Sequence, residues 1–148
     1  PQRGSPYCVI MNPLVSNLGM PCSAPPWATL DATDLESGER LWSVPLGTLE
    51  KMAPWPFYHL IDGGMEMGGP SVTASGLIFI AATSDGYMRA FDIDTGGELW
   101  KHELPTTGNA VPMTYIYQGR QYLVIAAGGH FTSPLPAGDH LVAFRLAE

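Results

Sequence analysis

The amino-acid sequence predicts an all-β fold made of short antiparallel strands. Its 148 residues include 17 Gly and 14 Pro, about a fifth of the chain against roughly 12% in an average protein. Charged residues account for only 14%, which disfavours helical bundles and coiled coils because these need many Glu and Lys residues. A hydrophobic fraction of 45%, with 10% aromatic residues, can bury a core and argues against disorder. Strands separated by frequent turns remain as the expected architecture.

Charge and hydropathy argue against nucleic-acid binding and against a membrane-spanning helix. The net charge of −7 would repel a polyanion, so nucleic acid is not expected as a partner. The longest apolar runs, Leu77–Ala82 and Tyr122–Ala127, are strand-sized and much shorter than the roughly 20 residues of a membrane-spanning helix. Cys8 and Cys22 leave open whether they pair. The chain begins at Pro1 without the features of a signal peptide, so we expect it to be cut from a longer protein.

An internal repeat indicates which all-β architecture this is. The pattern Ala-x-Asp-x-x-(Ser/Thr)-Gly-x-x-Leu-Trp occurs at 32–42 and at 90–100, with the same offset of 58 at every matched position. A third copy begins at Ala143-Phe144. Once insertions of 13 and 8 residues are discounted, the repeating unit is 45 residues long. This length, several short strands and a Trp are typical of a four-stranded β-propeller blade, which has about 40–50 residues.

The repeat assigns structural roles to its matched residues. Its Gly occupies a tight turn that needs a positive φ, and the Asp and Ser/Thr before it can hydrogen-bond the turn backbone. Its Trp offers a large flat face that packs against the neighbouring blade. The matched residues are Ala32, Asp34, Gly38 and Trp42 in the first copy and Ala90, Asp92, Gly96 and Trp100 in the second.

The remaining elements follow from the repeat in chain order. We expect strands of the second unit near 71–73, 77–82, 87–92 and 98–103, and strands of the third unit at 111–117, 121–127 and 140–146. The chain then divides into the end of one blade at 1–46, a long loop at 47–67, a blade at 68–104 and a last blade at 105–148 that lacks its fourth strand. Such an incomplete C-terminal portion of one propeller domain exposes sheet edges, which we expect to associate with other copies.

The motifs resemble a known family along the whole chain. The repeat resembles the tryptophan-docking repeat of quinoproteins, the dehydrogenases that use pyrroloquinoline quinone (PQQ). Further motifs are similar to the C-terminal part of the membrane-bound PQQ-dependent glucose/quinate/shikimate dehydrogenases. They are Gly4-Ser-Pro-Tyr7, Met11-Asn12-Pro13, Gly19-Met-Pro-Cys22, Pro26-Trp27, Met67-Gly-Gly-Pro70, Phe79-Ile-Ala-Ala-Thr83, Pro112-Met-Thr-Tyr115 and Ala127-Gly-Gly-His130. The loop at 47–67 departs most from the family and leaves the substrate open.

The resemblance implies an eight-bladed propeller on the periplasmic side of the bacterial inner membrane, tethered by an N-terminal membrane domain outside this chain. It implies oxidation of a sugar, polyol or cyclitol hydroxyl with PQQ, and transfer of the electrons to ubiquinone. A calcium or magnesium ion would polarise the quinone as a Lewis acid, while a carboxylate base takes the hydroxyl proton. In this family the base and most cofactor ligands lie in earlier blades, so we expect the chain to be inactive alone.

Two side chains are candidates for the cofactor site. His130 follows Gly128-Gly129, and glycines let a backbone approach a ligand closely, but a solvated loop histidine is the alternative. Asp85 is followed by Gly86, and Asp-Gly is also an ordinary hairpin signal. The resemblance implies that His130 lies near PQQ and the metal. It also implies that Asp85 lies near the metal and the cofactor.

The glycine-rich run at 63–69 is a third candidate. It is not a phosphate-binding loop, because no Gly-Lys-Ser/Thr follows it. Gly68 and Gly69 either let the backbone approach PQQ near the propeller axis or simply begin a strand that packs against the previous blade. The loop before them carries Trp55, Phe57 and Tyr58, whose rings either wall the substrate entrance or cover a neighbouring blade.

Two other patterns are not expected to bind metal. Asp92 and Asp94 suggest a calcium loop, but Gly96 occupies the next ligand position and no Glu closes the loop. Three further residues fit no metal-ligand spacing and are expected in a solvated loop. They are His59, Asp62 and Glu66.

A second class of function stays open. Non-catalytic propellers of outer-membrane assembly lipoproteins carry the same Trp-docking repeat, and a member of that class would be a binding scaffold. The segments Ala127-Gly-Gly-His130, Cys22 and Pro26-Trp27 favour the enzyme, because a scaffold has no need for them. A WD40-like interaction protein is disfavoured, since no Gly-His…Trp-Asp signature occurs.

Overall fold

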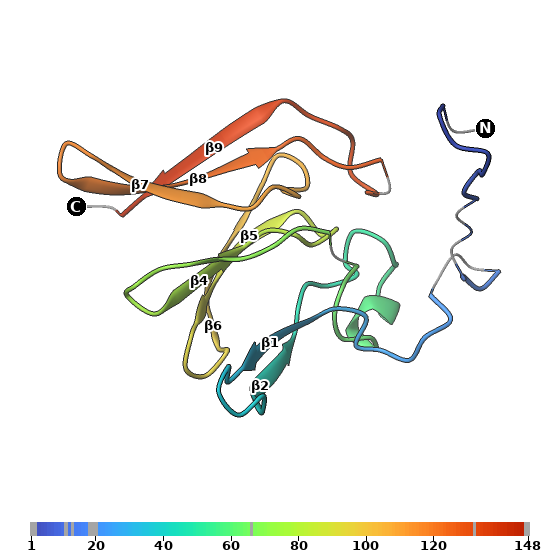
Figure 1. Ribbon diagram of the computed structural model, residues 1–148, viewed down its shortest axis with the longest axis horizontal. Coiled ribbons are helices and arrows are strands. Elements are labelled where there is room, and N and C mark those ends of the chain that lie inside the picture. The colour runs from blue at the N-terminus through green and yellow to red at the C-terminus, as the bar shows by residue number, and fades with distance from the viewer. Residues whose placement is uncertain are drawn as a thin grey trace.

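The computed structural model describes residues 3–10, 12, 14–17, 21–65, 67–131 and 133–146. These residues form three antiparallel sheets that follow one another across the molecule in chain order (Figure 1). The first sheet pairs β1 (Thr29–Thr33) with β2 (Arg40–Pro45). The second has the order β3 (Ser71–Val72), β4 (Leu77–Ile80), β5 (Tyr87–Asp92) and β6 (Glu98–Glu103). The third has the order β7 (Met113–Tyr117), β8 (Arg120–Ala127) and β9 (His140–Arg145).

The prediction of an all-β antiparallel fold is confirmed. In the second and third sheets each strand pairs with the next one along the chain, as in a propeller blade. The connection between the first two sheets contains the 3-10 helix η1 (Phe57–His59). The division of the chain at 46, 67 and 104 stays a prediction. Some residues of the predicted motifs lie outside the described ones, namely Met11, Pro13, Gly19, Met20 and Glu66.

Strand β4 shows how the second sheet holds both of its neighbours. Successive side chains of a strand point to opposite faces, so alternate residues serve different cores. Ile78 and Ile80 belong to a cluster shared with the first sheet, whose other buried members are Ala28, Leu30, Leu46, Ala82 and Phe91. Phe79 and the following Ala81 belong to a cluster shared with the third sheet, together with Met88, Leu104, Leu123, Ile125 and Ala127. The uninterrupted apolar run of this strand therefore reflects burial on both faces.

Both complete copies of the repeat form the same turn. Between β1 and β2, the Asp34 carboxylate accepts hydrogen bonds from the N–H and the hydroxyl of Ser37 at 2.7 and 2.9 Å. Between β5 and β6, the Asp92 carboxylate accepts the equivalent hydrogen bonds from Thr95 at 2.9 and 2.8 Å. These Asp side chains satisfy the turn backbone locally, which is why the pattern needs Asp and Ser/Thr at these places.

Trp42 joins the first sheet to the second. Its indole N–H donates to the carbonyl oxygen of Ile93 at 2.9 Å. Its ring lies against Gly96, where an added Cβ would come within 2.6 Å of Trp42 Cε3. Gly38 has the same place in the first copy and a similar φ, +73° against +70°, but no described atom lies within 4 Å of its added Cβ. Gly96 is therefore needed both for the turn and for the room beneath the indole.

Trp100 holds the equivalent place in the second sheet. Ala90 faces it across β5 and β6, as Ala32 faces Trp42 across β1 and β2. Its ring meets Phe144 of β9 edge to face, with 5.2 Å between the ring centroids. Trp100 remains 37% exposed and borders an apolar groove of about 370 Å³ between the second and third sheets. The second interface is therefore less completely filled than the first.

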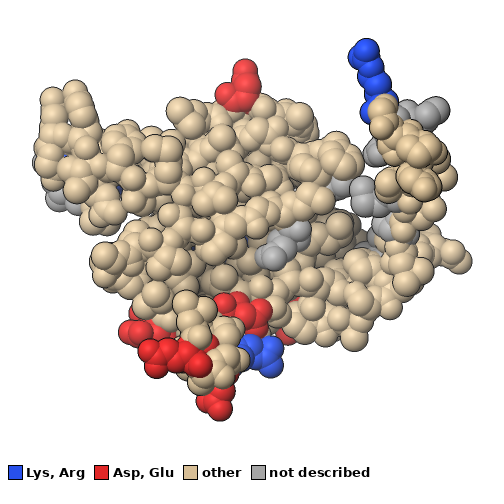
Figure 2. All heavy atoms as spheres, viewed as in Figure 1, with Lys and Arg blue, Asp and Glu red and all other residues tan. Residues whose placement is uncertain are grey.

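The surface carries little charge on the face drawn in Figure 2. Acidic side chains gather there at the end of the molecule that holds the β1–β2 and β5–β6 turns. Cys8 and Cys22 are both free thiols and exposed. Within the described part of the chain, no helix has the length and apolar character needed to cross a membrane.

Candidate functional site

The candidate site lies where the connections of the second and third sheets meet. The β4–β5 connection and the β8–β9 connection lie at the same end of their sheets (Figure 1). The N–H of Leu104, at the end of β6, donates to the carbonyl oxygen of Gly86 at 2.8 Å. The N–H of Gly129, after β8, donates to the carbonyl oxygen of Thr107 at 3.0 Å. These backbone hydrogen bonds bring together the β4–β5 connection, the segment between β6 and β7, and the β8–β9 connection.

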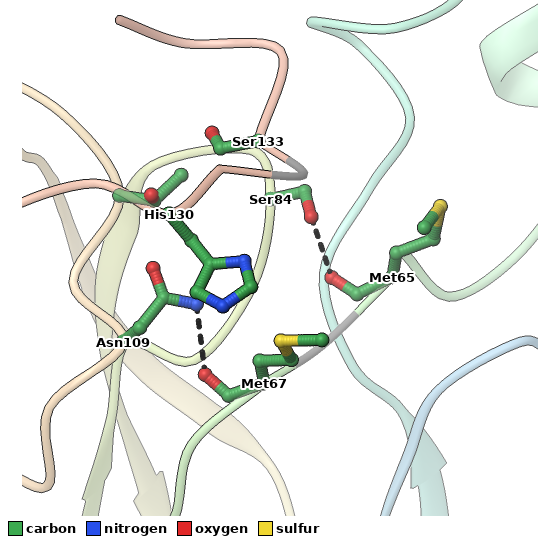
Figure 3. A pocket seen from close by; sticks show the side chains of 7 residues that line it. Met65, Met67, Ser84, Asn109, His130 and Ser133 are labelled. Atoms are coloured by element: carbon green, nitrogen blue, oxygen red, sulfur yellow. Dashed lines mark hydrogen bonds between the residues drawn. The ribbon is translucent and has the colours of Figure 1, made fainter. Parts of the chain in front are cut away.

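A small pocket opens at this junction (Figure 3). Its volume is about 30 Å³. The residues that line it come from four separate segments and are Met65, Met67, Ser84, Thr107, Asn109, His130 and Ser133. Figure 3 shows His130, Asn109 and Met67 pointing toward the same space. The pocket thus collects polar groups from regions that are far apart in the sequence.

Met65 and Met67 are held by the segment that follows β4. Both the N–H and the hydroxyl of Ser84 donate to the carbonyl oxygen of Met65, at 2.9 and 3.0 Å. The N–H of Met67 donates to the carbonyl oxygen of Ala82 at 2.8 Å. Gly68 follows with a φ of +146°, and an added Cβ would lie 2.8 Å from Ala82 Cβ. The close approach that Gly68 permits is therefore made to the protein itself, and its contact with a cofactor stays a prediction.

Asn109 and Thr107 bring the unpaired polar atoms of the pocket. The amide N–H of Asn109 donates to the carbonyl oxygen of Met67 at 2.9 Å. Asn109 Oδ1 and Thr107 Oγ1 are buried and have no hydrogen-bond partner among the described residues. A buried polar atom without a partner costs roughly 1–3 kcal/mol. Two such atoms in one pocket indicate a place where a further polar group binds.

His130 reaches the pocket from the β8–β9 connection, as its position after two glycines suggested. Gly129 has a φ of +76°, and an added Cβ would lie 2.9 Å from Ala137 Cα, in the later part of the same connection. Only glycine fits this close turn of the backbone. The His130 ring is half-buried and lies on the pocket wall, with the Phe131 ring 4.4 Å from it. Its contact with PQQ stays a prediction.

Asp85 is the centre of a buried network outside the pocket. Its carboxylate pairs with the Arg89 guanidinium through Nη2 at 2.5 Å and Nη1 at 3.1 Å. The Thr83 hydroxyl donates to it at 2.6 Å, and the N–H and hydroxyl of Thr48 donate at 2.8 and 3.1 Å. Burial alone would raise the pKa of Asp85, but the hydrogen bonds and charge of Arg89 outweigh it and hold that pKa below its usual value. The network ties the start of the 47–67 loop to the β4–β5 turn.

The network occupies the carboxylate that the sequence analysis names as a metal ligand. A carboxylate offers about four lone-pair sites, and both Asp85 oxygens are already engaged by protein donors. Among the described residues, no group of three or more His, Cys, Asp or Glu side chains is close enough to hold a metal ion. The described residues therefore do not form a complete metal site by themselves, and Asp85 as a metal ligand stays a prediction.

PQQ itself fits the pocket only along one edge. Pockets that enclose organic ligands measure about 300–1,000 Å³, ten times or more the volume found here. Thr107, Asn109 and His130 offer polar groups suited to an edge of a polar molecule. Gly69 does not line the pocket, and its added Cβ would make an ordinary contact with Val111 Cγ2 at 3.4 Å. The described residues can thus form one wall of a larger site.

The sequence missed three residues that the structure brings to prominence. Thr107 and Asn109 lie in an irregular loop, where periodicity gives no signal. Arg89 did carry a signal: it is a charged residue within an otherwise apolar strand, four residues after Asp85, and it is 2% exposed. A buried Arg needs a carboxylate partner, so its pairing with Asp85 was open to prediction.

Successive antiparallel sheets that pack face to face through a repeated Trp define a β-propeller protein. Residues 1–123 match the family model described as "PQQ: Glucose/ethanol/alcohol dehydrogenase, beta-propeller domain". The chain is 42% identical over 151 residues to the quinoprotein glucose dehydrogenase of Escherichia coli (strain K12), covering 100% of this chain and 19% of that protein. It is 46% identical over 153 residues to a probable quinate dehydrogenase (quinone) of Xanthomonas campestris pv. juglandis, again covering 100% and 19%.

A solved structure agrees with these relatives. The quinohemoprotein alcohol dehydrogenase from Comamonas testosteroni matches with a TM-score of 0.55 and 28% identity, over 76% of this chain and 14% of that chain. The chain therefore belongs to the family of PQQ-dependent quinoprotein dehydrogenases, and the resemblance found in its motifs is confirmed. It spans about a fifth of the length of the two relatives, 19% of each.

Proposed function

We propose that the chain forms blades of a PQQ-dependent dehydrogenase that oxidises a hydroxyl group of a sugar, polyol or cyclitol. The observation that carries this proposal is the family match along 1–123, joined to relatives whose names specify glucose and quinate as substrates. The name of the quinate relative also specifies a quinone, which supports ubiquinone as the electron acceptor. We place the enzyme on the periplasmic side of the inner membrane, with eight blades in the complete propeller.

The residues of this chain supply binding and positioning in that enzyme. A bound PQQ would supply the acceptor for the two electrons that leave the substrate carbon. His130 is held on the pocket wall by the tight Gly128-Gly129 backbone, and we assign it a hydrogen bond to the cofactor. Asp85 acts indirectly, because its pairing with Arg89 fixes the β4–β5 connection, which carries Ser84. Ser84 in turn holds Met65 through a hydrogen bond.

A pocket whose lining residues carry unpaired polar atoms supports an enzyme over a scaffold. A binding scaffold has no need to bury Thr107 Oγ1 and Asn109 Oδ1 without partners at one junction. The chain by itself offers one wall of the site, so we propose that it has no activity alone. Its outer strands β7 and β9 are sheet edges, through which isolated copies would associate.

The test uses the complete enzyme that contains this chain. PQQ is added together with calcium or magnesium, and reduction of an artificial electron-accepting dye is followed with glucose, quinate, shikimate and glycerol in turn. The proposal expects dye reduction that requires PQQ and is restricted to a subset of these substrates. An enzyme that binds no PQQ and reduces no dye with any of them contradicts it.

A further inference from the structure

The two unpaired atoms, Thr107 Oγ1 and Asn109 Oδ1, indicate which chemical group binds in the pocket. Thr107 is 1% exposed, and it lines the same pocket as Asn109. Thr107 Oγ1 and Asn109 Oδ1 are both buried. Neither atom has a hydrogen-bond partner within the described part of the chain. Protein folding rarely leaves buried polar atoms unpaired, so a further polar group is expected to complete both.

The orientation of the Asn109 amide selects the chemistry of that group. Its NH2 donates to the carbonyl oxygen of Met67 at 2.9 Å, and a carbonyl accepts only, so the amide cannot be turned the other way. Asn109 Oδ1 is therefore the atom left over, and it requires a donor. The Thr107 hydroxyl can donate or accept. A hydroxyl group satisfies both atoms, whereas a carboxylate, which only accepts at neutral pH, would leave Oδ1 unpaired.

The size of the pocket limits how much of the ligand enters. A volume of about 30 Å³ accommodates roughly one water-sized group. This is enough for one hydroxyl of a larger molecule whose remaining atoms lie outside. The Met65 and Met67 side chains add an adaptable apolar lining suited to the carbon atoms next to such a hydroxyl.

We propose that Thr107 and Asn109 bind one non-reacting hydroxyl of the substrate, and so help to set which polyhydroxy compound the enzyme accepts. The inference rests on the proposed function and deepens it, because it assigns substrate selection to this chain. Both are positioning residues, and neither takes part in the transfer of electrons or protons.

The test compares Thr107→Val with Thr107→Ser in the complete holoenzyme. The Val side chain removes the hydroxyl at nearly the same shape, and the Ser side chain keeps it. For the best of glucose, quinate and glycerol, we expect kcat/KM to fall about 10-fold with Thr107→Val, mostly through KM, and to stay within about 3-fold with Thr107→Ser. Thr114→Val, on β7 and away from the pocket, serves as the matched control and should leave kcat/KM unchanged.

Deoxy substrates identify the hydroxyl that is bound. With the wild-type enzyme, one deoxy analogue of the best substrate should be turned over about 10-fold less efficiently because Thr107 and Asn109 lose their partner. With Thr107→Val the same analogue should show little further loss, since the two changes remove one interaction. Losses that multiply for every analogue would overturn the inference.

Binding of PQQ separates the substrate from the cofactor as the partner. We expect the Kd for PQQ, measured by quenching of protein fluorescence, to change less than about 2-fold in Thr107→Val. A matching loss of PQQ affinity would mean that the atoms bind the cofactor, and an unchanged KM for every substrate would mean that water satisfies them. Either result overturns the inference while the wild-type enzyme remains active, whereas an inactive wild-type enzyme overturns the proposed function together with it.

Discussion

The docking of Trp42 on Gly96 predicts unequal costs for the same substitution at two matched glycines. Gly38→Ala and Gly96→Ala both place a Cβ at a positive φ, +73° and +70°, which costs roughly 1–2 kcal/mol in each case. At Gly38 no described atom lies within 4 Å of the added Cβ. At Gly96 the Cβ would lie 2.6 to 2.9 Å from three atoms of the Trp42 indole. Overpacking of this kind adds roughly 1–3 kcal/mol, so Gly96→Ala should cost about 2–5 kcal/mol in all.

Urea unfolding followed by circular dichroism measures both costs. The difference in the free energy of unfolding between the two variants isolates the contact with the indole, because the backbone contribution is common to both. In a Trp42→Ala background the clash disappears, and Gly96→Ala should then cost no more than Gly38→Ala. Equal costs for the two glycines in the parent protein would refute the docking of Trp42 on this turn.

Three further predictions concern the buried Asp85 network and the core. Asp85→Asn should destabilise the fold by roughly 1.5–3 kcal/mol in thermal or urea unfolding, because Arg89, at 2% exposure, loses its buried charge partner and keeps only the Glu98 carboxylate, 3.1 Å from its Nε. A loss below about 1 kcal/mol would contradict the pairing. The folded pKa of Asp85 lies below the ordinary value of 3.8, so its contribution to stability is complete above that pH and is lost as the pH falls through the folded pKa. As the pH falls, the difference in the free energy of unfolding between the parent protein and Asp85→Asn should therefore decrease. A difference that stays constant would contradict this pH dependence. Met88→Ala empties a site that is 0% exposed and should cost roughly 2–5 kcal/mol in urea unfolding, whereas Leu35→Ala at 98% exposure should stay within about 0.5 kcal/mol, and similar losses would place Met88 outside the core.

The sequence predicted the strands well because local chemistry determines them. Glycine at a positive φ and an Asp that caps its own turn act within a few residues, so the two repeats could be read directly at Gly38 and Gly96. The apolar run at 77–82 signalled burial without needing a partner to be known. The hydrogen bond from Trp42 to Ile93 joins residues 51 positions apart, so it could be identified only from the folded structure.

The candidate site was predicted only where a motif marked it. His130 follows two glycines and belongs to a family motif, so it was identified, and it does line the pocket. Thr107 and Asn109 were not, because their importance comes from burial and from hydrogen bonds that remain unmade. Those properties depend on the hydrogen bond between Asn109 and Met67. The two residues are 42 positions apart, so no local sequence pattern predicts this hydrogen bond. The role of Asp85 likewise depends on Thr48, 37 residues earlier.

A PQQ titration of the complete enzyme tests the central claim most directly. Parent protein, His130→Asn and His102→Asn are compared, and His102 serves as the control because it lies on the edge strand β6 and lines no part of the pocket. We predict saturable PQQ binding by the parent protein and by His102→Asn, and a Kd about 10-fold higher for His130→Asn, as expected when one buried hydrogen bond to the cofactor is lost. Equal PQQ affinity in all three proteins would remove His130 from the site, and no PQQ binding by the parent protein would contradict the proposed function.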